Sequence, residues 1–186
     1  MTSIDDLWFL ADTASQRAEQ AAHQLRTRYD DYLGKRQSRR VSRRRFRTLA
    51  ERIRLSGAPY GAHTIVHRED GDVLLVRHDG IDQWVLPGGE VARDETFREA
   101  ARRELAEEAG IEAEYDGLAL LVTVEIESDG HETWGVMPIF EAQARNERTV
   151  IDDPDGEISD ARWFTTVPPD SRDRPYLNAW REKQNE

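Results

Sequence analysis

Apolar positions in the first third of the chain recur at steps of three and four residues. Between residues 5 and 33 they include Leu7 and Leu10, and this spacing predicts a long helix that is stopped by Gly34. A second helix is expected over 38–55. Together these segments predict an N-terminal helical hairpin that packs onto the rest of the chain or onto a partner chain.

The remainder of the chain alternates short apolar runs with turn sequences. Residues 62–68 and 72–78 are rich in β-branched side chains and flank the sequence EDGD, which predicts a β-hairpin. Strands mixed with helices predict an α/β fold in which helices cover a sheet. Further strands are expected at 118–127, 133–144 and 160–167, and a terminal helix at 175–183.

The segment GGEVARDETFREAARRELAEEAGI, residues 88–111, predicts a helix with marked ends. Thr96 and Glu99 have the spacing of a capping box, in which a hydroxyl and a carboxylate satisfy free backbone amides at the helix start. Gly110 suits the left-handed conformation that ends many helices. The helix is therefore expected between Thr96 and Gly110.

Three glutamates share one face of this predicted helix. Glu104, Glu107 and Glu108 are related by three- and four-residue steps, so their like charges repel by roughly 0.2–0.5 kcal/mol per pair. Either the face is simply solvated, on a chain rich in acids, or a divalent cation with oxygen ligands lies among the carboxylates. The preceding LPGGE at 86–90 favours the cation, because two glycines let a backbone carbonyl approach a ligand closely.

The same stretch resembles the sequence box that marks the Nudix hydrolase family. The similarity fills every defined position of the box without a gap, and the preceding QWVLPGG also resembles the family's approach to it. It extends over about residues 58–183 and does not explain residues 1–56. The matching positions are Gly89, Glu95, Arg103, Glu104, Leu105, Glu107, Glu108, Gly110 and Ile111.

The resemblance implies a Nudix-type α/β/α sandwich with a mixed β-sheet, and hydrolysis of a nucleoside diphosphate linked to another moiety. It implies Mg²⁺ or Mn²⁺ as cofactor, bound by Glu104, Glu107, Glu108 and the carbonyl of Gly89. It also implies catalytic roles for Glu104 and for Arg103, which would orient the glutamates through charge-assisted hydrogen bonds. Phosphoryl transfer needs charge neutralisation and an aligned water, which these residue types can supply.

The general base of such a reaction has several candidates. Glu104 is the candidate inside the box, but some members of the family use a glutamate outside it. The alternatives in this chain are Glu157, Glu125 and Glu127, each of which could equally be a solvated surface acid.

Aromatic residues and histidines add little at this point. Trp84 and Trp134 could stack a nucleobase, although a tryptophan in such a strand more often belongs to the core. No histidine has ligand-like spacing to another, so no role is assigned to His63, His67, His78 or His131.

Charge is divided unevenly along the chain, whose formal net charge is −11. Residues 1–56 hold 13 basic and 7 acidic side chains, a balance of +6, and residues 57–186 have a balance of −17. This predicts a helical, Arg-rich extension at 1–56 and a Nudix hydrolase domain at 57–186. The basic run at 35–47 favours neutralisation of the acidic domain, within the chain or across a homodimer, and nucleic-acid binding is the alternative.

Composition narrows the class of protein further. The chain has no cysteine, which excludes disulfides and thiolate chemistry. No stretch has the apolar length of a membrane helix and the N-terminus lacks a basic signal segment, so a soluble, cytoplasmic protein without a membrane partner is expected. Only two of the 26 basic residues are lysines, which indicates halophilic adaptation or an arginine-biased genome.

The function predicted from these features is that of a Mg²⁺-dependent Nudix pyrophosphohydrolase with a nucleotide substrate. An ADP-ribose-like compound and a nucleoside triphosphate are both compatible with the sequence. The alternative is a non-catalytic Nudix-fold module that senses a nucleotide or binds RNA. A complete set of box carboxylates favours the enzyme, since a sensor does not need all of them.

Overall fold

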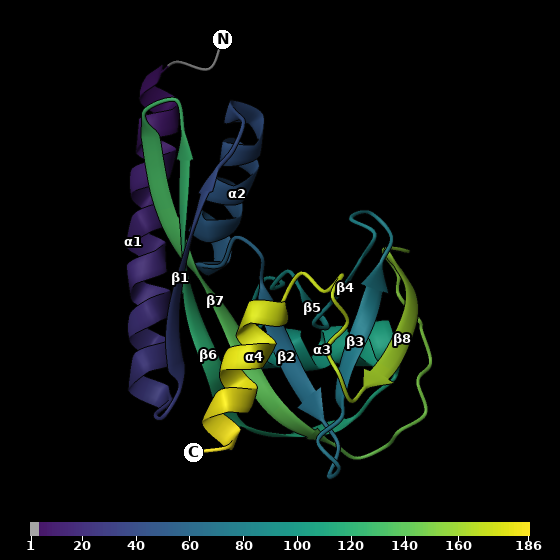
Figure 1. Ribbon diagram of the computed structural model, residues 1–186. Coiled ribbons are helices and arrows are strands. Elements are labelled where there is room, and N and C mark those ends of the chain that lie inside the picture. The colour runs from purple at the N-terminus through teal and green to yellow at the C-terminus, as the bar shows by residue number, and fades with distance from the viewer. Residues whose placement is uncertain (1–3) are drawn as a thin grey trace.

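The computed structural model describes residues 4–186, which form a mixed α/β structure with an 8-stranded sheet (Figure 1). The helices are α1 (Ile4–Arg28), α2 (Arg43–Ser56), α3 (Phe97–Ala109) and α4 (Arg174–Gln184). The strands are β1 (Leu33–Arg40), β2 (Ala62–His67), β3 (Val73–His78), β4 (Gln83–Val85), β5 (Gly88–Gly89), β6 (Ala113–Ser128), β7 (His131–Ala144) and β8 (Ile158–Phe164).

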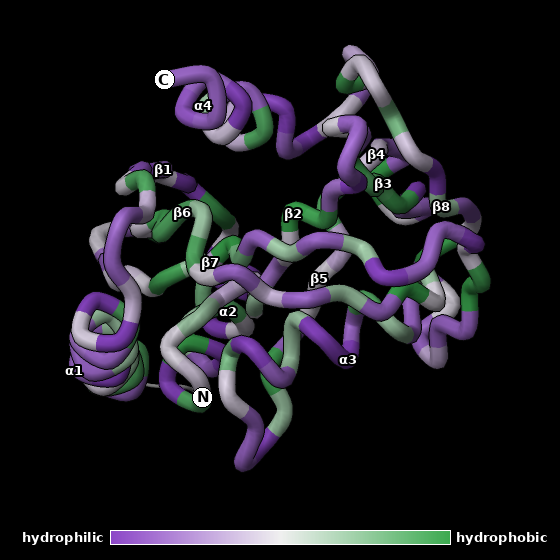
Figure 2. The backbone as a smooth tube through the Cα atoms, turned by 90° about the horizontal axis from the view of Figure 1, so that it is seen from below, coloured by the Kyte–Doolittle hydropathy of each residue, from purple (hydrophilic) through white to green (hydrophobic). Residues whose placement is uncertain are grey.

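The sheet runs in the order β1-β6-β7-β2-β3-β4, with β5 paired to β2 and β8 paired to β3. The β1–β6 and β2–β7 pairs are parallel and the other pairs are antiparallel. Helix α4 covers one face of the sheet, and α1 and α3 lie on the other (Figure 2). The predicted α/β class, mixed sheet and sandwich of helices around it are confirmed.

Apolar side chains fill the space between these layers. The largest cluster joins residues of α1 and α2 to strands β6 and β7 and to Leu177 and Trp180 of α4. A second cluster lies between α1, α3 and the other side of β6 and β7, and a third packs α3 against β3 and β8. The N-terminal helices therefore share a core with the sheet, as expected for a segment that packs onto the rest of the chain.

The segment between the two N-terminal helices differs from the prediction. Helix α1 ends at Arg28 and α2 begins at Arg43, so the predicted helix boundaries near 33 and 38 are wrong. Residues Leu33–Arg40 form β1, a parallel edge strand in register with β6 from Leu33↔Leu120 to Arg40↔Glu127. Backbone pairing to β6 overrides the helical spacing here, because local propensity is weaker than a full ladder of hydrogen bonds.

Two arginines of β1 form ion pairs with glutamates of the neighbouring strand β6. Arg36 donates to Glu125 at 2.7 Å, Ser38 donates to the other oxygen of Glu125 at 2.8 Å, and Arg40 donates to Glu127 at 3.1 Å. Opposite charges that face each other on adjacent strands stabilise the pairing. Part of the basic run at 35–47 is thus neutralised within the chain. Strand β1 belongs to the same sheet as the later strands, and the division of the chain into an extension (1–56) and a Nudix domain (57–186) stays a prediction.

Among residues 4–186, no helix is both long and apolar enough to cross a membrane.

Candidate active site

Helix α3 begins and ends where the sequence predicts. The hydroxyl of Thr96 accepts a hydrogen bond from the Glu99 amide at 3.2 Å, and the Thr96 amide donates to the Glu99 carboxylate at 2.8 Å. Gly110 adopts a left-handed φ of 66°, and its amide donates to the carbonyl of Ala106. These caps satisfy backbone groups at both ends and fix the direction in which the acids of α3 point.

One side of α3 packs on the sheet and carries two of the three glutamates inward. Leu105 is buried in the apolar cluster, and Glu104 and Glu108, one turn apart, are each only 8% exposed. The side chain of Glu107 is half-buried. The three acids therefore do not form a simple solvated face, since a buried carboxylate is costly unless it is paired or binds a metal.

The glycine pair before the box lies against these carboxylates. Strand β5 pairs with β2, which places Gly89 opposite Ala62. A Cβ atom on Gly89 would lie 2.6 Å from Glu104 Oε1, so a larger residue would displace that carboxylate. The amide of Gly88 donates to Glu108 Oε2 at 3.0 Å. Loop and helix thus bring a glycine backbone and two carboxylates into contact.

Arg103 connects the acids of the box. Its Nε donates to Glu95 at 2.8 Å and its Nη2 to the other oxygen of Glu95 at 3.1 Å, which makes a bidentate pair. Its Nη1 donates to Glu104 at 2.9 Å and to Glu107 at 3.3 Å, and Nη2 also donates to the carbonyl of Glu90 at 2.9 Å. One guanidinium therefore sets the positions of several acidic groups through charge-assisted hydrogen bonds.

The electrostatics of the site favour a bound positive charge. Burial foremost, together with nearby carboxylates, raises the pKa of Glu108 to about 9, against the opposing effect of the Gly88 amide. Burial also raises the pKa of Glu104, although Arg103 opposes that rise. Both carboxyls are thus held in a setting that disfavours their negative charge unless a cation compensates it.

The residues present fit a hard divalent cation. Their donors are the carboxylate oxygens of Glu104, Glu107 and Glu108, which suit Mg²⁺ or Mn²⁺ better than soft metals. Because position 89 has no side chain, the carboxylate of Glu104 can lie directly against the loop backbone.

An acidic loop, whose aspartates the sequence analysis did not name, lies beside these carboxylates. The amide of Asp152 donates to the carbonyl of Glu107 at 2.8 Å and docks this loop on the end of α3. Asp153 raises the pKa of Glu108, and Asp155 raises that of Glu104, so both lie close to the site. The dense acids of the stretch DDPDGE were the available signal.

Comparison with known proteins decides the family. The family model of the NUDIX domain matches residues 58–174. The chain belongs to the Nudix family. A Bacillus subtilis (strain 168) protein provisionally named 8-oxo-dGTP diphosphatase is 45% identical over 53 residues, which are 28% of this chain and 36% of that protein. The chain thus matches about a third of the length of that curated relative.

Solved structures show the same fold. The MutT protein from Methanosarcina mazei Go1 superposes with a TM-score of 0.51 at 21% identity, over 67% of this chain and 94% of that chain. The NUDIX domain of Shewanella oneidensis NrtR, complexed with ADP ribose, gives a TM-score of 0.50 at 21% identity, over 67% and 86% of the two chains. At this identity the likeness establishes a Nudix fold and nothing about substrate.

Within this Nudix fold, the glutamates considered as general base lie in different surroundings. Glu157 raises the pKa of Glu108, so it lies near the carboxylates of α3, and its Oε2 is 3.3 Å from Nε2 of His78. Glu125 and Glu127 instead accept hydrogen bonds from the side chains of β1. The structure therefore brings only Glu157 of these three close to the box.

The two tryptophans of the Nudix domain that were considered for stacking are partly buried against the core. The ring of Trp84 meets that of Phe164 edge-on at a centroid distance of 4.9 Å, and Arg77 and Arg162 lie over it. Trp134 lines a cleft with residues of β1. The contact of Trp84 with Phe164 agrees with the interpretation that a tryptophan in such a strand belongs to the core.

The histidines have different environments. His63 is buried behind the glycine loop, and burial lowers its pKa to about 4. His131 packs between Trp8 and Phe46. His67 lies near two carboxylates that are distant in the sequence, a grouping that local spacing could not reveal.

Proposed function

We propose that this Nudix protein is a Mg²⁺- or Mn²⁺-dependent pyrophosphohydrolase that cleaves a nucleoside diphosphate linked to another moiety. The observation that supports the proposal most is the arrangement of Glu104 and Glu108, which are buried, acidic and adjacent to the Gly88–Gly89 backbone. Such a grouping is unfavourable alone and becomes favourable when a cation and a phosphate group bind there.

In this proposal Glu104, Glu107, Glu108 and the carbonyl of Gly89 hold the metal. The bound cation supplies charge neutralisation for the diphosphate and lowers the pKa of a bound water. Arg103 keeps the carboxylates in place through its hydrogen bonds to Glu104 and Glu107.

The proton from the attacking water has two candidate acceptors. Glu104 is beside the glycine loop but is also bound to Arg103, which competes for its oxygens. The side chain of Glu157 is exposed, so its carboxylate can turn from its contact with His78 toward a substrate. We expect Glu157→Gln to lower kcat with little change in metal affinity if Glu157 is the base, and to leave kcat unchanged if Glu104 is.

The substrate class is open between two alternatives. One relative is named for 8-oxo-dGTP, a nucleoside triphosphate, and one solved Nudix domain is complexed with ADP ribose. The proposal therefore covers an ADP-ribose-like compound and a nucleoside triphosphate. A panel of both kinds, assayed in parallel with and without Mg²⁺, identifies the preferred class.

Two isosteric variants test the catalytic site. Glu104→Gln and Glu107→Gln keep the shape of each side chain but remove its charge, so each is expected to lose most Mg²⁺-dependent turnover while the protein stays folded. Glu114→Gln is the matched control, because Glu114 is an exposed acid of β6. Near-normal turnover in both test variants would exclude the box as the catalytic centre.

The alternative function is a non-catalytic module that senses a nucleotide or binds RNA through the basic run at 35–47. Binding to RNA at low and at high salt tests it, since contacts to phosphates weaken steeply as salt rises. Nucleotide binding without any Mg²⁺-dependent turnover would support the module over the enzyme. Neither a homodimer nor a cytoplasmic location is needed by the proposal, and both stay predictions.

A further inference from the structure

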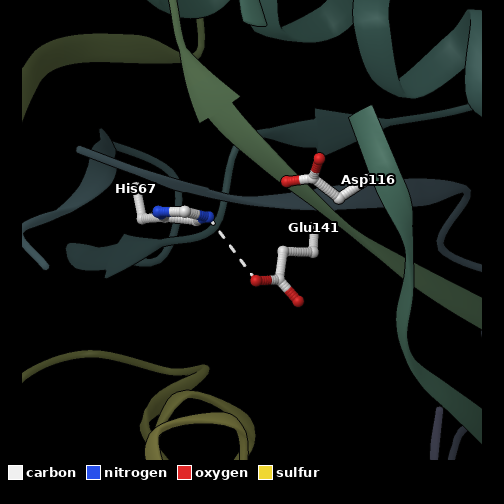
Figure 3. Close-up of side chains that lie close together, drawn as sticks. All are labelled: His67, Asp116 and Glu141. Carbon is white, nitrogen blue, oxygen red and sulfur yellow. Dashed lines mark ion pairs between the residues drawn. The ribbon is translucent and has the colours of Figure 1, made fainter. Parts of the chain in front are cut away.

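Three side chains from neighbouring strands gather on the face of the sheet that α4 covers. His67 ends β2, Asp116 lies in β6 and Glu141 lies in β7. Each offers one ligand atom, and these atoms lie within 4.8 Å of one another (Figure 3). The three residues are far apart in the sequence and are brought together only by the pairing of their strands.

A β-bulge directs Asp116 into this group. The register between β6 and β7 shifts between Tyr115 and Gly117, so Asp116 is the extra residue of the bulge. The residues that flank it pair with Ala142 and Glu141. A bulge changes the direction of a side chain and is frequent beside functional sites. Here it adds a second carboxylate to the pair formed by His67 and Glu141.

The contact between His67 and Glu141 is longer than a good ionic hydrogen bond. Nε2 of His67 lies 3.5 Å from Glu141 Oε1, whereas such bonds are typically about 2.7–2.9 Å. This nitrogen is buried and has no hydrogen-bond partner, although Glu141 still raises the pKa of the imidazole. Nδ1 lies 3.4 Å from the carbonyl of Arg68, a contact that leaves the lone pair of Nε2 for another partner.

Helix α4 covers one side of the group with Trp180. This tryptophan is 5% exposed, and its ring lies 5.6 Å from that of His67. Its indole N–H is buried without a hydrogen-bond partner within ordinary limits. Trp180 also helps to lower the pKa of the Glu141 carboxyl, after the larger effect of His67. A buried imidazole nitrogen without a partner, here Nε2 of His67, indicates that a further group belongs in this space.

Charge also favours a cation here. With a neutral imidazole the group carries the two negative charges of Asp116 and Glu141, which a divalent ion would balance. Lys183 of α4 is the nearby cation that acts on Glu141, but its ammonium is bound to Asp31 at 2.9 Å. Gln184 contributes only an amide contact of 3.4 Å to Glu141.

We propose that His67, Asp116 and Glu141 form a second metal site, for a divalent transition metal such as Zn²⁺, distinct from the carboxylates of α3. Zinc bonds of about 2.0–2.2 Å in a tetrahedron place neighbouring ligand atoms roughly 3.4 Å apart. The separation of 3.5 Å between His67 and Glu141 already matches this edge. The remaining separations, all within 4.8 Å, close by side-chain rotation of the exposed Asp116.

The mixed ligand set distinguishes this site from the one on α3. Imidazole with two carboxylates suits Zn²⁺ and related transition metals, whereas Mg²⁺ prefers oxygen ligands alone. The fourth position is available to water. The ion would link β2, β6 and β7 beneath α4, so its binding should raise the stability of the fold by mass action rather than alter catalysis directly.

Calorimetric titration of the full-length protein with zinc chloride, in excess Mg²⁺ to occupy the α3 carboxylates, tests the proposal. Wild-type protein is expected to bind one Zn²⁺ in this medium. Asp116→Ala and His67→Gln should each weaken that step at least about tenfold, the size of effect that loss of even a supporting residue has at a metal site. Glu114→Ala, an acid of the same strand, and His23→Gln, an exposed histidine, are the controls and should bind zinc as wild type does.

A second measurement makes the result independent of protein stability. Cobalt(II) in a tetrahedral site with nitrogen and oxygen ligands has strong visible absorption, which should be present in wild type and absent in Asp116→Ala. Because Asp116 is exposed, this variant is expected to fold even if His67→Gln does not. Mg²⁺-dependent turnover should be unchanged in Asp116→Ala, so failure of the zinc site and failure of the proposed hydrolase activity are separate outcomes.

Absence of the zinc step in wild type would overturn the proposal. Wild-type zinc affinity in Asp116→Ala would also overturn it, since the ion would then lie elsewhere and His67 and Glu141 would form only an ion pair. Loss of zinc binding in Asp116→Ala, with both controls intact, supports the site.

Discussion

The absence of a side chain at Gly89 lets the glycine loop lie against the acids of α3. Gly89 lies in ordinary backbone conformation, so the reason for glycine there is space rather than a left-handed φ. The position that a Cβ atom would take on residue 89 is only 2.6 Å from Oε1 of Glu104, so a methyl group there would displace that carboxylate. This single contact connects the loop of the box to its helix.

Gly89→Ala is therefore expected to reduce turnover on the order of 100-fold, because a shift of about 1 Å in a catalytic group has effects of that size. Stability should change much less than activity. Gly34→Ala is the matched control, since a Cβ atom there meets nothing within 4 Å. Steady-state kinetics and a thermal melt of both variants make the comparison, and equal activity in the two would contradict this account of Gly89.

His63 gives a pH dependence of stability. Burial foremost, and then Arg172, lower its pKa to about 4 in the folded protein, against 6.5 for an unperturbed histidine. Below pH 6.5 His63 becomes protonated in the unfolded state, whereas in the folded state it stays neutral until about pH 4. Stability should therefore fall as pH falls through this window, by at most about 1.4 kcal/mol per pH unit from this residue.

The variant His63→Gln removes that titration, so its free energy of unfolding should depend less on pH between about 4 and 6.5 than that of wild type. Urea unfolding at several pH values measures the difference. His23→Gln, on the exposed side of α1, should keep the wild-type slope. A parallel pH dependence in His63→Gln and wild type would show that His63 is not responsible.

At the scale of elements, the caps of α2 and α3 allow an effect on stability to be distinguished from an effect on catalysis. Thr96 caps α3, which carries the carboxylates, and Ser42 caps α2, which does not. Both side chains accept a hydrogen bond from a backbone amide at 3.2 Å. The two caps are thus chemically alike but have different positions relative to the site.

Thr96→Ala and Ser42→Ala should each lower the free energy of unfolding by about 1 kcal/mol. Only Thr96→Ala is expected to reduce turnover as well, because it loosens the first turn of the helix that positions Glu104. Chemical unfolding and kinetics on both variants provide the test. A loss of turnover in Ser42→Ala equal to that in Thr96→Ala would mean that the effect is one of general stability.

The whole molecule is built on a core that includes the N-terminal segment. Leu7, Leu10, Phe46 and Leu49 are buried in the same cluster as residues of β6 and β7. Helix α2 also reaches the box, since Arg52 forms an ion pair with Glu90. The N-terminal segment is thus part of the surroundings of the candidate active site.

Removal of residues 1–56 should expose this apolar surface and the edge of β6. We expect the remaining chain to aggregate or to lose its cooperative thermal transition, because burial of apolar area is the main source of stability. A fragment 57–186 that melts as cooperatively as the full chain would instead support two independent units, the division that charge and family resemblance predict.

The excess of acids predicts a dependence on salt. Net charge of −11 produces repulsion within the fold, which concentrated salt screens. The melting temperature is expected to rise between about 0.1 M and about 2 M KCl, although ion pairs such as Arg36 with Glu125 weaken slightly over the same range. No rise would remove the prediction of halophilic adaptation and leave an arginine-biased composition.

The local sequence determined those features that depend on neighbours along the chain. The caps of α3, its bounds, the strands β2, β3 and β7 to within a few residues, and the Nudix resemblance all follow from short-range patterns. They do so because a helix cap, a periodic apolar face and a fixed box need only residues that are close in sequence.

Only the tertiary structure decided the features that depend on pairing between distant segments. Residues 33–40 form a strand because β6 offers a parallel partner, and the spacing of residues within the segment does not predict this pairing. Asp153 and Asp155 reach the α3 carboxylates through the docking of a loop, and His67 meets Asp116 and Glu141 through a bulge and two strand pairings. Such contacts are set by the register of the sheet, which one sequence does not reveal because many registers satisfy the same local pattern.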